Sequence, residues 1–491
     1  MYKDGAVVSN RIVVVGGGSA GWLSALAMQN KYPDSNITVI ASEEIGILGA
    51  GEGTTPYFVS FLEQLGILTS DIIRNCKGTI KTGIDFKEWN SSKKGYLHSF
   101  SSIYSYYNYN SKNFTRYALA SDASGYKSFA YKLTQEEKCP FAINKLNNLE
   151  TVGEYKYALH FDANLLAGYL KDVSLSRGVN YINDKVISFE TTPTNEIVSA
   201  HLESNNTVEL DFLVDCSGFA RLTMGRLFND EWISYKDKLP VDTAAPFFIP
   251  HNNDVRPVTE AIAMKYGWVW KIPVRDRYGC GYVFDSNHIS KDEAIQEAEE
   301  YFNMKLSSPR EFKFEPGRYR HTLVKNCLAI GLAQGFIEPL EATSLWVTCS
   351  ILDAFTRNDG CAMWQDTSFY DSFNYNYGCL MDDILDFVHL HYMTDREDSD
   401  FWINFKYNHS LNERQKAIVS GIQNNTDLSE YHSFFDISSW ALVSNGIGLL
   451  NIKDNNPYQR IIYNNYIQEH QAVVENCLSH KLFLDYCEKF A

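Results

Sequence analysis

A glycine-punctuated loop carries the side chains best suited to chemistry in this chain. It spans Gly331–Ser344 and follows a short apolar run. Glu338 and Glu341 supply carboxylates for proton transfer, while Thr343 and Ser344 supply hydroxyls beside backbone N–H groups that can hold an anion. A strand that ends in such a loop predicts a segment facing a ligand.

A second glycine-rich segment predicts where a nucleotide is held. Residues Gly16–Gly21 match the pattern Gly-x-Gly-x-x-Gly, after the β-branched run 11–15 and before a helical pattern over 22–31. Glycines allow a tight turn and let the backbone approach a pyrophosphate at a helix N-terminus. With a further strand at 37–40, this is the βαβ unit of a dinucleotide-binding domain.

Two other strand ends belong to the same predicted domain. The acid that usually binds the ribose is replaced by Ala41, with Glu43 and Glu44 just after it, so the ribose-binding acid stays open. Farther along, Asp215–Phe219 places an acid and a glycine after a strand, and it resembles the second flavin-binding segment of aromatic hydroxylase-like flavoproteins. Nicotinamide dehydrogenases need only the first segment, so the pair favours FAD over NAD.

Alternating tryptophans narrow the class further. Taken alone, Trp268 and Trp270 also fit a buried strand. With Ile272 and Pro273 they form the Trp-x-Trp-x-Ile-Pro pattern, which resembles that of flavin-dependent halogenases. The resemblance covers most of the chain, including the segments Gly51–Pro56, Ile80–Phe86, His160–Ala163 and Asn326–Gly331. The sequence is therefore similar to the tryptophan-halogenase-like family.

The resemblance implies an FAD site drawn from widely separated residues. These are Gly16, Gly18, Ser19, Ala20, Gly21, Ser42, Gly51, Glu52, Val186, Asp215, Gly218, Leu332 and Leu345. Trp268 and Trp270 are implied to crowd the flavin face and to discourage direct oxygen transfer to an organic substrate. The single Rossmann fingerprint is taken by FAD, so the cofactor is expected to arrive as FADH2 from a separate flavin reductase. Halide and O2 complete the reactants.

The same resemblance places the catalytic lysine at Lys81 and the catalytic glutamate at Glu341. Reduced flavin and O2 oxidise halide to hypohalous acid, which a lysine can hold as an ammonium or take up as a haloamine. Glu341 is expected to polarise that oxidant and to accept the ring proton. Thr343 and Ser344 fall on the halide-binding turn, where Ala342 replaces a serine common in the family.

Substrate contacts are predicted at His98 and Phe100, where related enzymes place rings against an aromatic substrate. Phe100 is suited to stacking and His98 to hydrogen bonding. A core phenylalanine beside a surface histidine is the alternative. The two residues lie in a Tyr-rich insertion at about 94–132, which reads either as a lid or as a solvated surface excursion.

Composition limits the partners and the compartment. The net charge of −16 argues against nucleic acid and anionic membranes, and no apolar run reaches membrane-spanning length. Ten cysteines without a Cys-x-x-Cys pair or a histidine cluster predict neither a disulfide framework nor a metal site. A cytoplasmic protein acting on a small aromatic substrate is expected, and a homo-oligomer is left open.

These features predict an α/β (α+β) fold, with a Rossmann-like FAD-binding domain of the aromatic-hydroxylase/halogenase type and a mostly helical C-terminal lobe. The expected boundaries are 1–345 for the FAD-binding core and 346–491 for the helical, substrate-side lobe. The predicted function is FADH2-dependent halogenation of an electron-rich, indole-like aromatic. An aromatic hydroxylase and a non-catalytic flavin-binding protein are the alternatives.

Overall fold

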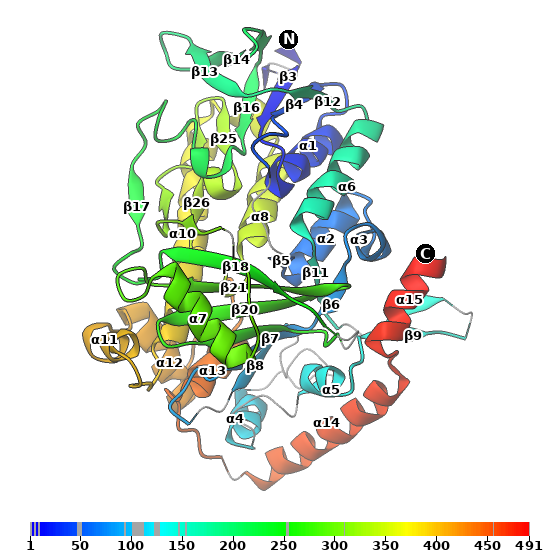
Figure 1. The fold of residues 1–491 in the computed structure, drawn as a ribbon, viewed down its shortest axis with the longest axis vertical. Coiled ribbons are helices and arrows are strands. Elements are labelled where there is room, and N and C mark those ends of the chain that lie inside the picture. Colours follow the sequence, from blue (N-terminus) through cyan, green and yellow to red (C-terminus); the bar gives the residue numbers. More distant parts are fainter. Residues whose placement is uncertain are drawn as a thin grey trace.

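The computed structural model describes residues 2–3, 6–7, 10–46, 52–92, 95–100, 112–121, 128–145, 148–152, 155–251, 255–308, 310–454 and 456–490. Figure 1 shows the part predicted to bind a nucleotide at one end of the long axis, a second large sheet across the middle, and helices at the other end. One buried apolar cluster draws members from the N-terminal strands and from the C-terminal helices, Ile12 and Cys487 among them. The chain thus packs around a shared core.

The nucleotide-binding part is built on a six-stranded sheet. Its order is β12 (Asn180–Asn183), β4 (Asn36–Ala41), β3 (Arg11–Val15), β16 (Phe212–Asp215), β25 (Cys327–Ala329) and β24 (Leu323–Val324), and every neighbouring pair is parallel except the last. Helices α1 (Ser19–Lys31) and α6 (Ala163–Ser176) pack against one another beside it. Buried parallel strands need apolar side chains on both faces, which the run Ile12–Val15 provides.

The second sheet has seven strands and crosses the middle of Figure 1. Its order is β22 (Phe312–Lys313), β18 (Thr243–Ile249), β21 (Arg277–Phe284), β20 (Gly267–Val274), β19 (Thr259–Ala263), β7 (Gly83–Lys87) and β8 (Tyr96–Ser99). Beside it, a three-stranded sheet joins β5 (Glu52–Gly53), β11 (Ala158–Phe161) and β6 (Thr79–Lys81). Strands β6, β8 and β20 therefore bring Lys81, His98 and both tryptophans of the Trp-x-Trp pattern into one region.

Smaller elements complete the N-terminal two thirds. The remaining strands are β1 (Tyr2–Lys3), β2 (Ala6–Val7), β9 (Phe141–Ile143), β10 (Leu149–Thr151), β13 (Val186–Thr191), β14 (Ile197–Leu202), β15 (Thr207–Glu209), β17 (Trp232–Ser234), β23 (Gly317–Tyr319) and β26 (Gly335–Phe336). The remaining helices are α2 (Pro56–Gln64), α3 (Thr69–Asn75), α4 (Lys112–Ser121), α5 (Phe129–Gln135) and α7 (Lys291–Phe302). Helices α4 and α5 belong to the Tyr-rich insertion, whose Tyr104, Tyr106, Tyr107 and Tyr109 lie outside the described residues.

The part of the chain after Thr343 is helical, as the sequence predicts. It comprises α8 (Ser344–Arg357), α9 (Gly360–Met363), α10 (Thr367–Tyr392), α11 (Asp400–Asn408), α12 (Glu413–Asn424), α13 (Ile437–Gly446), α14 (Pro457–Asn476) and α15 (His480–Phe490). The last two run back along the N-terminal part, where α14 packs against α4 and α5. His480 Nε2 accepts a hydrogen bond from the Ile80 N–H at 3.0 Å, so α15 supports the strand that carries Lys81. Among the described residues, no helix has both the length and the apolar character of a membrane span.

Candidate active site

A cavity of about 1410 Å³ extends from the edge of the six-stranded sheet to the second sheet. Its lining includes most of the residues predicted to hold FAD, namely Gly16, Gly18, Ser19, Ala20, Ser42, Glu52, Val186, Gly218, Leu332 and Leu345. Lys81, Trp268, Trp270 and Ser344 line it as well. Lys81 therefore shares one continuous space with predicted nucleotide-binding residues from as far apart in the sequence as Gly16 and Leu345, whereas Glu341 and Thr343 do not line it.

The turn before α1 is shaped to receive a phosphate. Gly16 has φ +120°, and a Cβ there would collide with the Cys216 carbonyl, as a Cβ on Gly21 would collide with the Gly16 carbonyl. By contrast, a Cβ on Gly18 would meet no protein atom within 4 Å. Gly18 also caps α1 without a side-chain hydrogen bond, so the first N–H groups of the helix remain available to an anion.

Other parts of the cavity also fit a bound dinucleotide. Thr348 lines it, is 1% exposed, and has a buried hydroxyl oxygen without a hydrogen-bond partner in the described structure. Glu43 lines the nucleotide end and contacts Lys171 at 3.0 Å, whereas Glu44 contacts Lys185. Of the two acids left open by the sequence, Glu43 is the one that lines the cavity.

Two of the residues predicted to bind the cofactor do not line the cavity, and a third cannot be placed. Gly21 packs on the backbone of the turn and does not line the cavity. Asp215 is fully buried and accepts hydrogen bonds from the Ser217 N–H at 2.9 Å and from the Thr223 N–H and hydroxyl at 3.0 and 2.6 Å. Its carboxylate thus shapes the loop that carries Gly218. Gly51 lies outside the described residues.

The open space at Gly18 gives a direct test of this placement. Gly18→Val is expected to lower FAD affinity by at least about 100-fold, because the added carbons occupy the space in which a pyrophosphate approaches the helix. The melting temperature of the FAD-free protein should stay close to that of the wild type, since no protein atom is displaced. Flavin fluorescence titration measures the first quantity, and unaltered affinity would contradict the placement.

Lys81 is a fully buried lysine at the inner part of the cavity. Strand β6 places it opposite Ala158 of β11, and its Nζ donates a hydrogen bond to the Thr54 carbonyl at 2.9 Å. The ammonium lies 5.1 Å from the centre of the Phe100 ring, within cation–π range. Burial lowers the pKa of Lys81 to about 7, although the charge of Glu341 opposes this shift. Ammonium and amine forms are both populated near neutral pH.

Glu341 is a buried carboxylate held between two histidines. His98 Nδ1 lies 2.9 and 3.0 Å from its two oxygens, and His391 Nε2 lies 2.8 Å from Oε1. The Tyr96 hydroxyl is hydrogen-bonded to His391 Nδ1 at 2.7 Å and extends the chain of polar contacts. Burial alone would favour the neutral acid, but the two histidines outweigh it and lower the pKa of Glu341 to about 2. The carboxylate is therefore ionised throughout the neutral range.

Neither His391 nor Tyr96 was identified from the sequence as a functional residue. The segment 386–392 forms the last turns of α10. The structure adds that α10 directs His391 toward Glu341 across 50 positions of sequence. A histidine-rich helix gives no local signal of this contact, because the partner lies on a different element.

The two tryptophans of β20 differ in their surroundings. Trp268 and Trp270 both line the cavity, but Trp268 is only 1% exposed. Its indole N–H donates to Glu338 Oε2 at 3.3 Å, and the Tyr392 hydroxyl donates to the same oxygen at 2.8 Å. Trp268 thus connects the Trp-x-Trp segment to the carboxylate-bearing loop.

A small cavity of about 20 Å³ lies at the N-terminus of α8. Thr343, Ser344 and Glu338 line it, together with Gly331, Gly335, Phe336, Ile337, Val347 and Met381. Thr343 caps the helix without a side-chain hydrogen bond, and Ala342 before it adopts φ +54°. Gly331, Phe336 and Ser344 line the large cavity as well, so the two spaces adjoin. A space of this size admits a water-sized particle such as a monoatomic anion.

A cluster of aromatic side chains, here called the aromatic wall, packs beside His98, one of the predicted substrate residues. The His98 ring lies 5.4 Å from the Phe387 ring, which stacks on Phe435 at 3.8 Å. Trp346 and Trp440 pack on the same pair, at 5.4 Å from Phe435 and 5.3 Å from Phe387. His98 is thus buried beside Glu341, and Phe100 lies beside Lys81.

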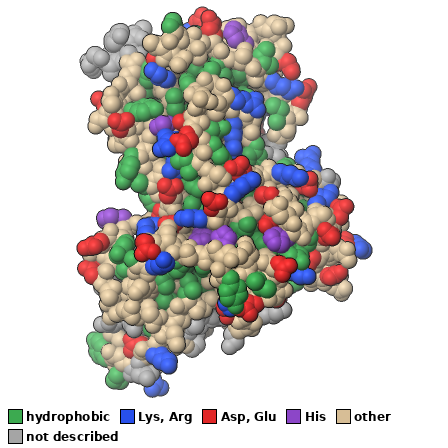
Figure 2. Space-filling model, turned by 90° about the vertical axis from the view of Figure 1, so that its left-hand side faces the viewer, with side chains coloured by type: hydrophobic (Ala, Val, Ile, Leu, Met, Phe, Trp, Pro, Cys, Tyr) green, Lys and Arg blue, Asp and Glu red, His purple; other side chains and the backbone are tan. Residues whose placement is uncertain are grey.

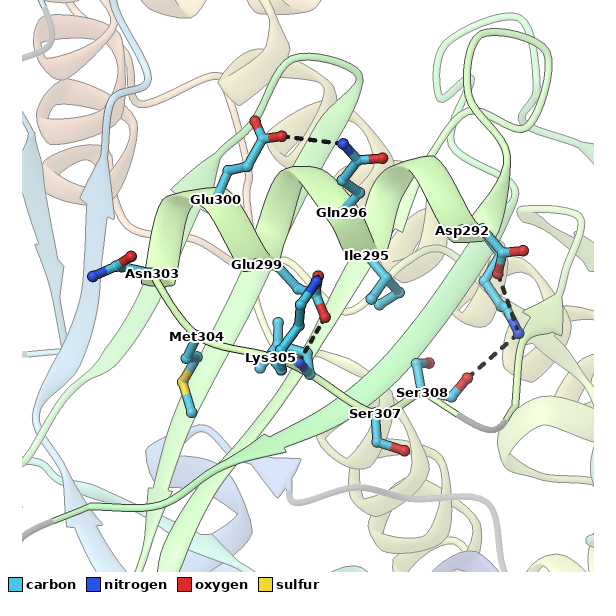
Figure 3. A pocket seen from close by; sticks show the side chains of 12 residues that line it. Asp292, Ile295, Gln296, Glu299, Glu300, Asn303, Met304, Lys305, Ser307 and Ser308 are labelled. Atoms are coloured by element: carbon cyan, nitrogen blue, oxygen red, sulfur yellow. Dashed lines mark hydrogen bonds and ion pairs between the residues drawn. The ribbon is translucent and has the colours of Figure 1, made fainter.

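The described surface along α7 offers no comparable chemistry. A concavity of about 840 Å³ along α7 is lined by surface side chains that pair among themselves, as Lys305 with Glu299 and Gln296 with Glu300 (Figure 3). Figure 2 shows acidic and basic side chains intermingled over one face of the molecule. Within the described residues, no group of three or more His, Cys, Asp or Glu side chains has the arrangement of a metal site.

Comparison with known proteins gives a consistent result. The sequence model of the tryptophan halogenase family matches residues 11–460. Tryptophan 7-halogenase RebH of Lentzea aerocolonigenes is 28% identical over 478 residues, covering 90% of each chain. Among solved structures, BrvH, a flavin-dependent halogenase from Brevundimonas sp. BAL3, superposes with a TM-score of 0.85 at 27% identity, covering 98% of this chain and 99% of its own. Xcc4156, a flavin-dependent halogenase from Xanthomonas campestris, superposes with a TM-score of 0.87 at 26% identity, covering 98% of each chain.

The match extends over both the nucleotide-binding part and most of the C-terminal helices, so it confirms the fold class predicted from the sequence. The chain belongs to the tryptophan halogenase family of flavin-dependent halogenases.

Proposed function

We propose that this enzyme halogenates an electron-rich, indole-like aromatic, using FADH2 from a separate flavin reductase, O2 and a halide ion. The observation that carries the proposal is the arrangement of Lys81 and Glu341. Both are buried, and they interact electrostatically. Lys81 lines the large cavity, which adjoins an anion-sized space at the N-terminus of α8, and Glu341 lies in the chain between the cavity-lining Leu340 and Ala342. RebH is named as a tryptophan 7-halogenase, which supports an indole-like substrate.

The residues around the large cavity would hold FAD. The N-terminus of α1 with Gly18 would receive the pyrophosphate, Glu43 the ribose, and the surfaces of Leu332, Leu345 and Trp268 would contact the ring system. When bound in reduced form, FAD supplies the oxidising equivalents from O2 that convert halide to hypohalous acid. All further steps depend on side chains of this chain.

Halide must lose part of its hydration shell before it becomes nucleophilic. Backbone N–H groups of the first turn of α8, with the hydroxyls of Thr343 and Ser344, would replace that shell. Hypohalous acid would then meet Lys81, which lines the same large cavity as Ser344. As an ammonium, Lys81 donates a hydrogen bond to the oxidant, and as an amine it forms an N–halogen bond with loss of water.

Glu341 would act as the base of the substitution. A carbon of the aromatic ring forms its bond to the halogen while the halogen–oxygen or halogen–nitrogen bond breaks, and the ring then loses a proton. Glu341, ionised at neutral pH, is able to accept it. His98 and His391 fix the orientation of the carboxylate, and Phe100 with the aromatic wall at Phe387 would hold the substrate ring.

The dependence on a separate reductase is open to experiment. With NADH alone, bound FAD is expected to stay oxidised and no halogenated product should form. Photochemically reduced FAD, supplied under air with bromide and an indole, should restore brominated product without any reductase. Flavin absorbance follows the first step and mass spectrometry the second. Rapid reduction of the bound flavin by NADH would contradict this part of the proposal.

A further inference from the structure

Glu338 stands out among the residues around the small cavity at the N-terminus of α8. Of the described residues that line this space, it is the only one with an ionisable side chain, since the others are glycines, apolar residues, Thr343 and Ser344. It is 2% exposed. The halogenation chemistry assigned to Lys81 and Glu341 makes no use of it.

The two oxygens of Glu338 have different surroundings. Oε2 accepts hydrogen bonds from the Trp268 indole at 3.3 Å and from the Tyr392 hydroxyl at 2.8 Å. Oε1 is buried and has no hydrogen-bond partner in the described structure. Because both donors converge on Oε2, Oε1 is the oxygen left to face the small cavity, and it is the natural position for a proton.

The electrostatic surroundings favour that proton. An ionised carboxylate loses solvation on burial, and no cationic side chain of the described chain forms an ion pair with Glu338 to compensate. The ionised Glu341, three residues along, adds repulsion. A neutral Glu338 removes both penalties and converts Oε1 from an acceptor that repels anions into an O–H donor.

We propose that Glu338 is a halide-site residue, which binds the ion in its neutral form by donating the Oε1–H, and that Trp268 and Tyr392 are positioning residues which hold Oε2. This inference rests on the proposed function, because it takes the small cavity at Thr343 and Ser344 to be the halide site. It also gives the indole N–H of Trp268 a specific task, which a phenylalanine could not perform.

The proposal predicts a characteristic pH dependence of halide binding. Burial raises the pKa of Glu338 to about 8, against the opposing effect of the two hydrogen bonds to Oε2. Below that pH the O–H donor is present, and above it a carboxylate adjoins the anion. The contribution of Glu338 to halide affinity should therefore be constant from about pH 6 to 7.5 and fall roughly tenfold per pH unit beyond about 8.

Three other groups face this part of the site. Glu341 is ionised over the whole range, and burial raises the pKa of Tyr392 well above its ordinary value, so neither changes charge between pH 6 and 9.5. Lys81 loses its charge near pH 7 and contributes a separate, earlier decline in affinity. Lys81→Met removes that contribution and isolates the effect of Glu338.

The test is chloride binding to the FAD-bound protein, measured by the line width of the chloride-35 NMR signal between pH 6 and 9.5. Lys81→Met serves as the background, and Glu338→Gln is added to it. The amide of glutamine can accept from Trp268 and Tyr392 through oxygen and donate N–H into the cavity at every pH. Its affinity at pH 6.5 should stay within about threefold of the background, and the decline above pH 8 should disappear.

A second variant tests the same proposal if Glu338→Gln does not fold. Trp268→Phe removes one donor from Oε2, which disfavours the ionised carboxylate, so the midpoint of the decline should move to higher pH. A merely structural role for either residue would change stability without moving that midpoint.

The possible failures are distinguishable. Chloride binding that does not decline above pH 8, or a decline of equal slope in Glu338→Gln, overturns the role of Glu338 and leaves the proposed function intact. Absence of chloride binding to the wild type at pH 6.5, with or without FAD, overturns the role of Glu338 together with the placement of the halide site.

Discussion

Lys81→Met is expected to reduce halogenation by at least about 100-fold while FAD binding is retained. Methionine keeps most of the volume of the buried side chain, so the packing of β6 against β11 is preserved. The variant lacks the nitrogen that donates to the Thr54 carbonyl and that would hold the oxidant. Steady-state product formation with excess halide and FADH2 measures the effect.

A matched lysine-to-methionine substitution on β7, the next strand along the chain, serves as the control. Lys87 lies on β7, is paired with Glu260 at 2.7 Å, and does not line the cavity. Lys87→Met should leave the rate within about twofold of the wild type, because Glu260 retains Arg256 and Lys271 as partners. Comparable rates in Lys81→Met and Lys87→Met would show that Lys81 does not handle the oxidant.

Glu341→Gln is the second substitution with a large expected effect, a rate loss of about 100-fold or more. Glutamine retains the shape of the side chain but is not a base, so the halogenated ring keeps its proton longer. Loss of that proton should then become the rate-determining step. A substrate deuterated at the halogenated carbon should show a kinetic isotope effect with Glu341→Gln that it does not show with the wild type. Glu299→Gln on α7 is the control, because the Glu299 carboxylate contacts Lys305 and the Leu306 N–H and does not line the large cavity.

The same substitution should alter the dependence of stability on pH. Because the folded-state pKa of Glu341 is about 2, below the ordinary value of 4.5, its ionised form stabilises the fold above about pH 4.5. That contribution is lost as pH falls toward 2. The difference in melting temperature between wild type and Glu341→Gln should therefore shrink from pH 6 to pH 3. A difference that is constant with pH would show that the histidine pair does not stabilise the carboxylate.

The nucleotide-binding half could be predicted from the sequence because its signals are local. The turn at Gly16–Gly21 joins a strand and a helix within one short segment, and the structure finds β3 and α1 on either side of it. The mostly helical character of residues 346–491 could be predicted on the same local grounds, and the structure begins the first of these helices, α8, at Ser344. The position and packing of α15 could not be predicted in this way, because the contact between His480 and Ile80 joins residues 400 positions apart.

The chemistry of individual residues was harder to predict. Nothing near Lys81 in the sequence shows that it is fully buried, and its predicted role came from the family resemblance alone. Asp215 ends a strand near the cofactor site, yet its carboxylate accepts hydrogen bonds from the loop that it supports. The pairing of Glu338 with Trp268 and Tyr392 spans three elements, so only the folded chain reveals it.

The central claim is that the enzyme transfers a halogen atom, and not an oxygen atom, to the aromatic substrate. Its most direct test supplies an indole, FADH2, bromide and ¹⁸O-labelled O2 to the enzyme, with catalase present, and records the product by mass spectrometry. The account predicts the bromine isotope pair in the product, no ¹⁸O, and loss of the signal in Lys81→Met. A product that gains one ¹⁸O and no bromine, equally with and without halide, would contradict the account and identify a hydroxylase.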